Sequence, residues 1–126
     1  MGSENPVFDT NILIDYLNGF REAAQELARY PAATISMVTW IEVMAGAKGE
    51  SEEKAIRSFL GRFKQLSVDR TIADAVFLLR CQHRIRLPDV IIWATARNQG
   101  TMLITRNTKD FPEDEPDIRV PYRLQT

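Results

Sequence analysis

Short apolar runs alternate along the chain with longer segments of helical periodicity. Val, Ile, Leu or Phe recur in these runs, and turn-forming or polar residues bound them, a pattern typical of buried β-strands. Because a helical segment separates most successive runs, the order predicts an α/β fold with a mainly parallel sheet. The strands are expected at 6–8, 33–36, 64–68, 102–105 and 118–120.

Turn and capping residues mark where the intervening helices begin and end. Gly19 closes the first helix, and Ser51, followed by two glutamates, is expected to begin the fourth. Asp69 caps a long fifth helix, and Pro88 opens the sixth. The helices are expected over 12–18, 21–30, 38–46, 51–61, 70–84 and 88–100.

Composition indicates an ordinary globular protein. The 126 residues are 44% apolar and 26% charged and contain no internal repeat, so we expect one domain spanning 1–126. Cys81 is the only cysteine and has no disulfide partner, which fits a reducing cytoplasm. The N-terminal segment 1–10 lacks the basic and apolar regions of a signal peptide, and no apolar run approaches the roughly 20 residues of a membrane span.

Charge alone does not identify a partner. The net charge is −1, which counts mildly against a nucleic-acid-binding protein with an extensive basic surface. Several basic residues nevertheless precede the acidic stretch 113–117 in the second half of the chain. Both a local basic surface and a solvated face of mixed charges fit this distribution.

Four acidic residues lie near the predicted edge of the sheet at which parallel α/β proteins bind ligands. Asp9 ends the first strand, Glu42 follows the second, Asp89 lies in the first turn of the sixth helix, and Asp110 follows the fourth strand. Ligands of open α/β sheets bind outside the carboxyl ends of the strands, where strand order reverses. We therefore expect these carboxylates to converge.

Convergent carboxylates indicate a divalent metal. They repel one another, and a cation relieves this repulsion. Mg²⁺ and Mn²⁺ prefer carboxylate and water oxygens, and such metals promote hydrolysis at phosphorus. Glu42 stands among apolar neighbours, so we expect it to be flanked by core, where an unpaired carboxylate is costly.

Four segments resemble the successive motifs of PIN-domain nucleases, in the same order and over nearly the whole chain. They are FDTNIL at 8–13, the stretch 35–46 that ends in WIEVMAG, LPDVIIWATA at 87–96 and LITRNTKDF at 103–111. The length and motif variants look most like VapC-type toxins of bacterial toxin–antitoxin systems. The resemblance implies a three-layer α/β/α sandwich and a Mg²⁺- or Mn²⁺-dependent endoribonuclease. It also implies a homodimer and a cognate antitoxin protein as partner.

The resemblance assigns roles to residues of this chain. Asp9, Glu42 and Asp89 take the acidic metal-site positions, and either Asn107 or Asp110 fills the fourth catalytic position. The remaining motif residues are expected to brace the pocket or contact substrate: Thr10, Asn11, Thr105, Arg106 and Asn107. For Arg106, a surface ion pair fits as well as a phosphate contact.

Aromatic residues and the single histidine are interpreted first as structural. Trp40 and Phe77 are expected in the core rather than as RNA-stacking platforms, and His83 and Cys81 are expected to be structural or exposed. Trp93 departs from the small residues common at its motif position. It is expected to narrow the site, face the core or face a dimer partner.

Other functions fit the sequence less well. A PIN module that only binds RNA or protein remains the alternative, although the three acids are intact. A haloacid-dehalogenase-like phosphatase needs an acid where this chain has Asn11, and a dinucleotide-binding domain needs a glycine-rich turn after the first strand. A related nuclease acting on DNA remains open, since the same chemistry cuts either backbone. The sequence leaves the RNA target and the number of metals undefined.

Overall fold

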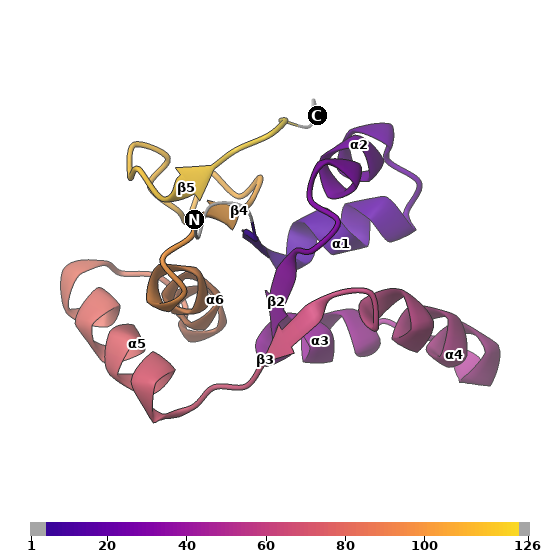
Figure 1. Ribbon diagram of the computed structural model, residues 1–126, viewed down its shortest axis with the longest axis horizontal. Coiled ribbons are helices and arrows are strands. Elements are labelled where there is room, and N and C mark those ends of the chain that lie inside the picture. Colours follow the sequence, from indigo (N-terminus) through magenta and orange to yellow (C-terminus); the bar gives the residue numbers. More distant parts are fainter. Residues whose placement is uncertain (1–4, 124–126) are drawn as a thin grey trace.

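The computed structural model describes residues 5–123 as a five-stranded sheet with six helices (Figure 1). Residues 1–4, part of the segment predicted to carry no signal peptide, lie outside the described range. The strands are β1 (Val7–Phe8), β2 (Thr34–Ser36), β3 (Lys64–Leu66), β4 (Leu103–Ile104) and β5 (Ile118–Arg119). The helices are α1 (Thr10–Leu17), α2 (Arg21–Arg29), α3 (Met37–Met44), α4 (Gly49–Leu60), α5 (Arg70–Gln82) and α6 (Leu87–Asn98).

All neighbouring strands are parallel, in the order β3-β2-β1-β4-β5. The chain moves outward from β1 to β2 and β3, and then returns to place β4 on the other side of β1. The order therefore reverses between β1 and β4, which is where ligands bind in open α/β sheets. The predicted parallel sheet is confirmed.

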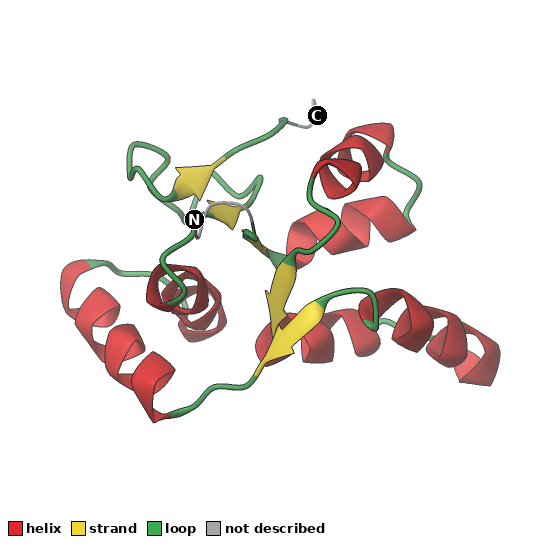
Figure 2. Cartoon of the chain, in the orientation of Figure 1, coloured by secondary structure: helices red, strands yellow, loops and turns green. Residues whose placement is uncertain are grey.

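The sheet is the middle layer of three (Figure 2). Adjacent residues of a strand point to opposite faces, and in β1 Phe8 joins the core beneath α1, α2 and α4, whereas Val7 joins the core beneath α5 and α6. Both residues have no exposed surface. Helices thus cover both faces of the sheet, and the α/β/α sandwich is confirmed.

Local capping explains most of the helix boundaries. The carboxylate of Asp69 accepts a 2.9 Å hydrogen bond from the backbone N–H of Ile72 at the start of α5, as predicted. Gly19 adopts a positive φ of 86° after α1, a conformation that glycine tolerates best. The predicted start of the fourth helix at Ser51 is wrong, because α4 begins at Gly49. The carboxylate of Glu52 accepts the N–H of the N-cap residue Lys48 at 3.0 Å and so stabilises this earlier start.

The aromatic side chains divide between core and surface. Trp93 is fully buried, and its indole N–H donates to Asp117 at 3.0 Å, so of the three alternatives the structure places it in the core. His83 is half-buried beside it, with ring centroids 4.9 Å apart. Phe77, predicted to be core, is 68% exposed on α5, which corrects that expectation. No helix within residues 5–123 is long and apolar enough to cross a membrane.

Candidate metal and nucleic-acid site

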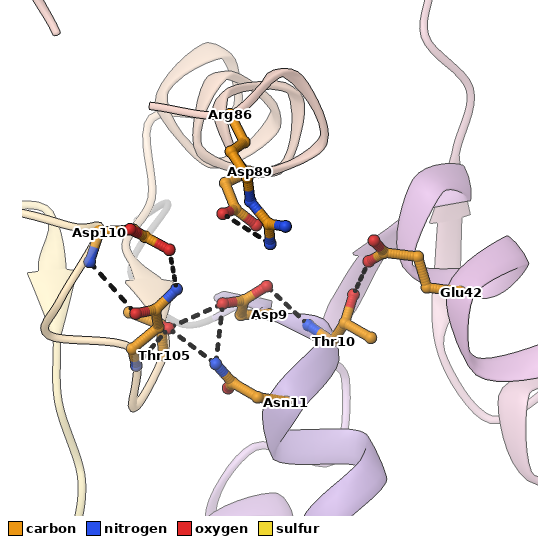
Figure 3. A network of polar contacts seen from close by, with 9 residues as sticks. Asp9, Thr10, Asn11, Glu42, Arg86, Asp89, Thr105 and Asp110 are labelled. Carbon is orange, nitrogen blue, oxygen red and sulfur yellow. Dashed lines mark hydrogen bonds and ion pairs between the residues drawn. The ribbon is translucent and has the colours of Figure 1, made fainter. Parts of the chain in front are cut away.

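A pocket of about 250 Å³ opens at the carboxyl edge of the sheet, next to the point where strand order reverses. Asp9 reaches it from the end of β1, Glu42 from α3 and Asp89 from the first turn of α6 (Figure 3). The lining residues are Asp9, Thr10, Asn11, Ile14, Glu42, Arg86, Asp89 and Asn107. Segments far apart in sequence thus bring three predicted acids to one pocket.

Asp9 is the most constrained of these acids. As N-cap of α1 it accepts the N–H of Thr10 through Oδ1 at 2.8 Å, and its Oδ2 accepts from the Thr105 hydroxyl at 2.7 Å and from Asn11 Nδ2 at 3.2 Å. Burial raises the pKa of Asp9 to about 6, with further contributions from Asp89 and Glu42, while the hydrogen bonds from Thr105 and Thr10 oppose this rise. Asp9 therefore caps α1 and also lines the acidic pocket.

Asp89 is a buried acid whose carboxylate has few stabilising neighbours. Only 7% of the residue is exposed, and its Oδ2 has no hydrogen-bond partner. The nearest cation is Arg86, whose Nη2 lies 3.6 Å from that oxygen, beyond hydrogen-bond distance. Burial raises the pKa of Asp89, Asp110 and Glu42 raise it further, and Arg86 opposes them. A buried carboxylate oxygen without a donor is one that a cation would satisfy.

Glu42 corrects the expectation of a buried glutamate. The residue is exposed, and its Oε1 accepts a 2.6 Å hydrogen bond from the Thr10 hydroxyl, which also lies 3.0 Å from the Thr39 hydroxyl. The argument from a costly buried carboxylate therefore does not apply to Glu42. Its place in the site rests on the shared pocket and on the contact with Thr10.

The two candidates for the fourth position lie side by side. Asn107 Nδ2 donates to Asp110 Oδ2 at 3.0 Å, and the N–H of Asp110 donates to Asn107 Oδ1 at 3.2 Å. Asn107 lines the acidic pocket, whereas Asp110 lines the neighbouring hollow beside Arg84 and Lys109. The structure thus places Asn107 in the lining of the acidic pocket and Asp110 beside it, where the charge of Asp110 raises the pKa of Asp89.

Arg106 is held by an acid that the sequence interpretation missed. Its guanidinium forms a bidentate ion pair with Asp15 of α1, with Nη2 2.9 Å from Oδ1, and Tyr122 donates its hydroxyl to the same carboxylate at 2.8 Å. Asp15 is only 2% exposed. An acid three residues after the core residue Ile12, on the same helix face, was the available signal. Of the two readings of Arg106, the structure supports the ion pair.

The donors suit a hard divalent cation, although no group of three His, Cys, Asp or Glu side chains within residues 5–123 already converges as a ligand set. The chemistry of the pocket is that of carboxylate and amide oxygens, which Mg²⁺ and Mn²⁺ prefer. Asp89 Oδ2 has no hydrogen-bond partner, and the two other acids of the pocket add to the rise that burial causes in the pKa of Asp9. Asp9, Glu42 and Asp89 are the residues that would hold the ion.

The fold and this pocket define an α/β/α protein with an acidic site at the switch point of a parallel sheet. The model of the PIN domain matches residues 7–113, and the chain belongs to this family. No curated protein matches the chain significantly.

Solved structures agree with this assignment. A chain of a toxin–antitoxin complex from Klebsiella pneumoniae is 44% identical, with a TM-score of 0.90, and the match covers 95% of this chain and 100% of that one. DNA-bound VapBC from Salmonella typhimurium (21% identical, TM-score 0.74, 91% and 95% covered) shares the fold. FitAcB from Neisseria gonorrhoeae (20% identical, TM-score 0.77, 94% and 99% covered) also shares it.

Proposed function

We propose that this protein is a Mg²⁺- or Mn²⁺-dependent endoribonuclease and the toxin of a type II toxin–antitoxin pair. The observation that carries the proposal is the pair of buried carboxylates, Asp9 and Asp89, that face one pocket, where Asp89 Oδ2 has no hydrogen-bond partner. Membership in the PIN family and the 44% identity to a chain of a toxin–antitoxin complex support it. The cytoplasm, where cellular RNA is accessible, is the proposed compartment.

Asp9, Glu42 and Asp89 would hold the metal, and the rest of the pocket orients them. A bound divalent cation supplies positive charge to the phosphate and lowers the pKa of nearby water. Thr105 and Asn11 fix the carboxylate of Asp9 from one side, and the N–H of Thr10 fixes it from the other. The Thr10 hydroxyl holds Glu42, so both acids are oriented before substrate arrives.

Asn107 completes the wall of the pocket. Its side chain is fixed by Asp110, and its backbone N–H donates to the Thr105 hydroxyl at 3.0 Å. The loop after β4 is therefore tied directly to the donor that orients Asp9. We propose that Asn107 faces the substrate, and that Asp110 fixes it and adds negative charge near Asp89.

Cleavage of a labelled panel of tRNA, rRNA and mRNA fragments, with matched DNA, tests the proposal. Wild type is expected to cut RNA with Mg²⁺ or Mn²⁺ and not with EDTA, and Asp9→Asn is expected to lose at least about 100-fold in rate. The control is Glu50→Gln, an exposed acid at the start of α4, which should cut like wild type. A folded Asp9→Asn protein with full activity would refute the site. Binding without cutting by any preparation would favour the non-catalytic PIN module.

A groove beside the acidic pocket suits a protein partner. It has a volume of about 430 Å³ and is lined by apolar side chains of α1, α3 and α4, together with Glu42 and Glu52. Ile14 and Glu42 line both hollows, so groove and pocket are continuous. We propose that the antitoxin lays an apolar segment in this groove and extends a Lys or Arg toward the carboxylates. Co-purification with the small protein encoded beside this chain tests it, and failure to form a complex on co-expression would argue against it.

We also propose a homodimer formed through α5. Phe77 and Leu78 are adjacent on this helix and are 68% and 62% exposed. Exposed apolar side chains grouped in this way often mark a protein interface. The resemblance to VapC-type toxins points to a second copy of the chain as the partner.

A further inference from the structure

Arg86 is the only cation among the eight residues that line the acidic pocket. It occupies the N-cap position of α6 but makes no capping hydrogen bond, so its side chain does not serve the helix. Its guanidinium instead points to Asp89 (Figure 3), with Nη2 3.6 Å from Oδ2. The neighbouring Arg106 is paired with Asp15 and has no comparable freedom. Arg86 is thus an exposed positive charge at the pocket whose guanidinium is held only by the 3.6 Å contact with Asp89.

The contact between Arg86 and Asp89 is loose. Its length exceeds that of a hydrogen bond, and 76% of the Arg86 side chain is exposed, against 9% of the Asp89 side chain. Water therefore reaches the guanidinium but not the carboxylate, and no hydrogen bond fixes the two together. The acid is therefore fixed in the wall of the pocket, while the cation that compensates it can move away.

Three carboxylates line the pocket, and a single guanidinium offsets them only in part. A divalent cation carries twice its charge and is small enough to contact several carboxylate oxygens at once. It would therefore compete with Arg86 for Asp89. The displaced side chain stays anchored at the start of α6, so its head remains within reach of the pocket.

We propose that Arg86 is a resident counter-ion of the acidic pocket, displaced from Asp89 by the divalent metal and then free to bind the phosphate of the RNA being cut. A guanidinium suits this second role, because it forms paired, charge-assisted hydrogen bonds with phosphate oxygens. Before the metal binds, the RNA would meet the carboxylates of the pocket, which repel its phosphates. After the metal binds, the RNA would meet the released guanidinium, which attracts them. The inference rests on the proposed function and assigns Arg86 to substrate positioning.

The inference predicts opposite changes in two measurements on Arg86→Ala. Mn²⁺ should bind the RNA-free protein roughly two- to fivefold more tightly, because the weak competing ion pair is gone. On the RNA that wild type cuts fastest, kcat/KM should fall roughly 10- to 100-fold through loss of a charged hydrogen bond. The slope of log kcat/KM against log salt should become shallower by about 0.7 to 1, the change for one phosphate contact.

Calorimetry with Mn²⁺ alone and cleavage across a salt series make the test. Arg86→Lys should bind Mn²⁺ nearly as wild type does and regain only part of kcat/KM, since an ammonium lacks the paired geometry. Arg21→Ala, which removes an exposed charge from the start of α2 outside the pocket, should change neither measurement.

Weaker or unchanged Mn²⁺ binding by Arg86→Ala, in a protein that melts like wild type, would overturn the inference and leave the nuclease intact. So would tighter Mn²⁺ binding with unchanged kcat/KM and salt slope, since the phosphate role would then be absent. Failure of wild type to bind Mn²⁺ or to cut any RNA would overturn the proposed function and the inference with it.

Discussion

Arg106→Met removes the cation that faces the buried carboxylate of Asp15. In the native protein Asp15 is 2% exposed and is compensated by two guanidinium nitrogens and the hydroxyl of Tyr122. The variant keeps much of the aliphatic stem but leaves a buried carboxylate with one neutral donor. We expect a large loss of stability, because a charge isolated in the interior is costly.

The magnitude follows from the burial of the two partners. Breaking a buried ion pair by removing one partner costs about 3–5 kcal/mol. Since 30% of the Arg106 side chain is exposed, water will reach part of the vacated space, and we expect a value just below that range, about 2–3 kcal/mol. For a chain of this length that corresponds to a fall in Tm of roughly 8–12 °C.

Urea unfolding followed by tryptophan fluorescence measures the effect, with an unchanged m-value as evidence of an intact native state. Arg70→Ala is the matched control, since it breaks a pair with Asp74 in which the side chains are 89% and 69% exposed. That variant should lose at most about 0.5 kcal/mol. The double variant Asp15→Asn with Arg106→Met should be more stable than Arg106→Met alone, because it removes the isolated charge.

The reasoning would be refuted if Arg106→Met cost no more than Arg70→Ala. It would also fail if the double variant were the less stable of the two, because the loss would then come from packing rather than from an uncompensated carboxylate.

Two further predictions concern pH and assembly. The pKa of Asp9 is about 6 in the folded protein, against an ordinary value of 3.8, so the folded state holds this proton more tightly than the unfolded state. In the metal-free protein, the contribution of Asp9 to the free energy of unfolding is therefore fully present below about pH 4 and is lost as pH rises through about 6. The loss is about 3 kcal/mol at most. Unfolding in EDTA at a series of pH values should show this loss in wild type and not in Asp9→Asn. The same dependence on pH in wild type and Asp9→Asn would contradict the prediction. Phe77→Glu should turn the proposed dimer into a monomer by light scattering, with stability changed by at most about 0.5 kcal/mol, whereas Ile41→Glu on α3 should remain dimeric. A dimeric Phe77→Glu protein would place the interface elsewhere.

The sequence predicts the centre of the sheet well because β1, β2 and β4 are buried along their whole length. Val7 and Phe8 are apolar at consecutive positions, which is typical of a central parallel strand, and Asp9 and Asp69 carry clear capping signals. Once the parallel order is known, the carboxyl ends of β1 and β4 must meet, and the convergence of Asp9 with the loop after β4 follows.

The errors lie where tertiary contacts decide exposure. Apolar sequence neighbours suggested that Glu42 is buried, yet on α3 Thr39 and Val43 face the core, and Ile41 itself is 59% exposed. Phe77 looked like a core residue because its side chain is large and apolar, yet it is 68% exposed. The pair between Asp15 and Arg106 joins residues 91 positions apart: the spacing from Ile12 indicates that Asp15 faces the core, but it does not identify Arg106 as the partner.

The central claim is that the pocket lined by Asp9, Glu42 and Asp89 holds the metal of an RNA-cutting enzyme. An anomalous difference map from crystals soaked in Mn²⁺, with RNA cleavage measured on the same preparation, tests it most directly. The account predicts a peak within coordination distance of Asp9 and Asp89, and its absence in Asp9→Asn crystals. A preparation that cuts RNA while its Mn²⁺ binds elsewhere, leaving this pocket empty, would contradict it.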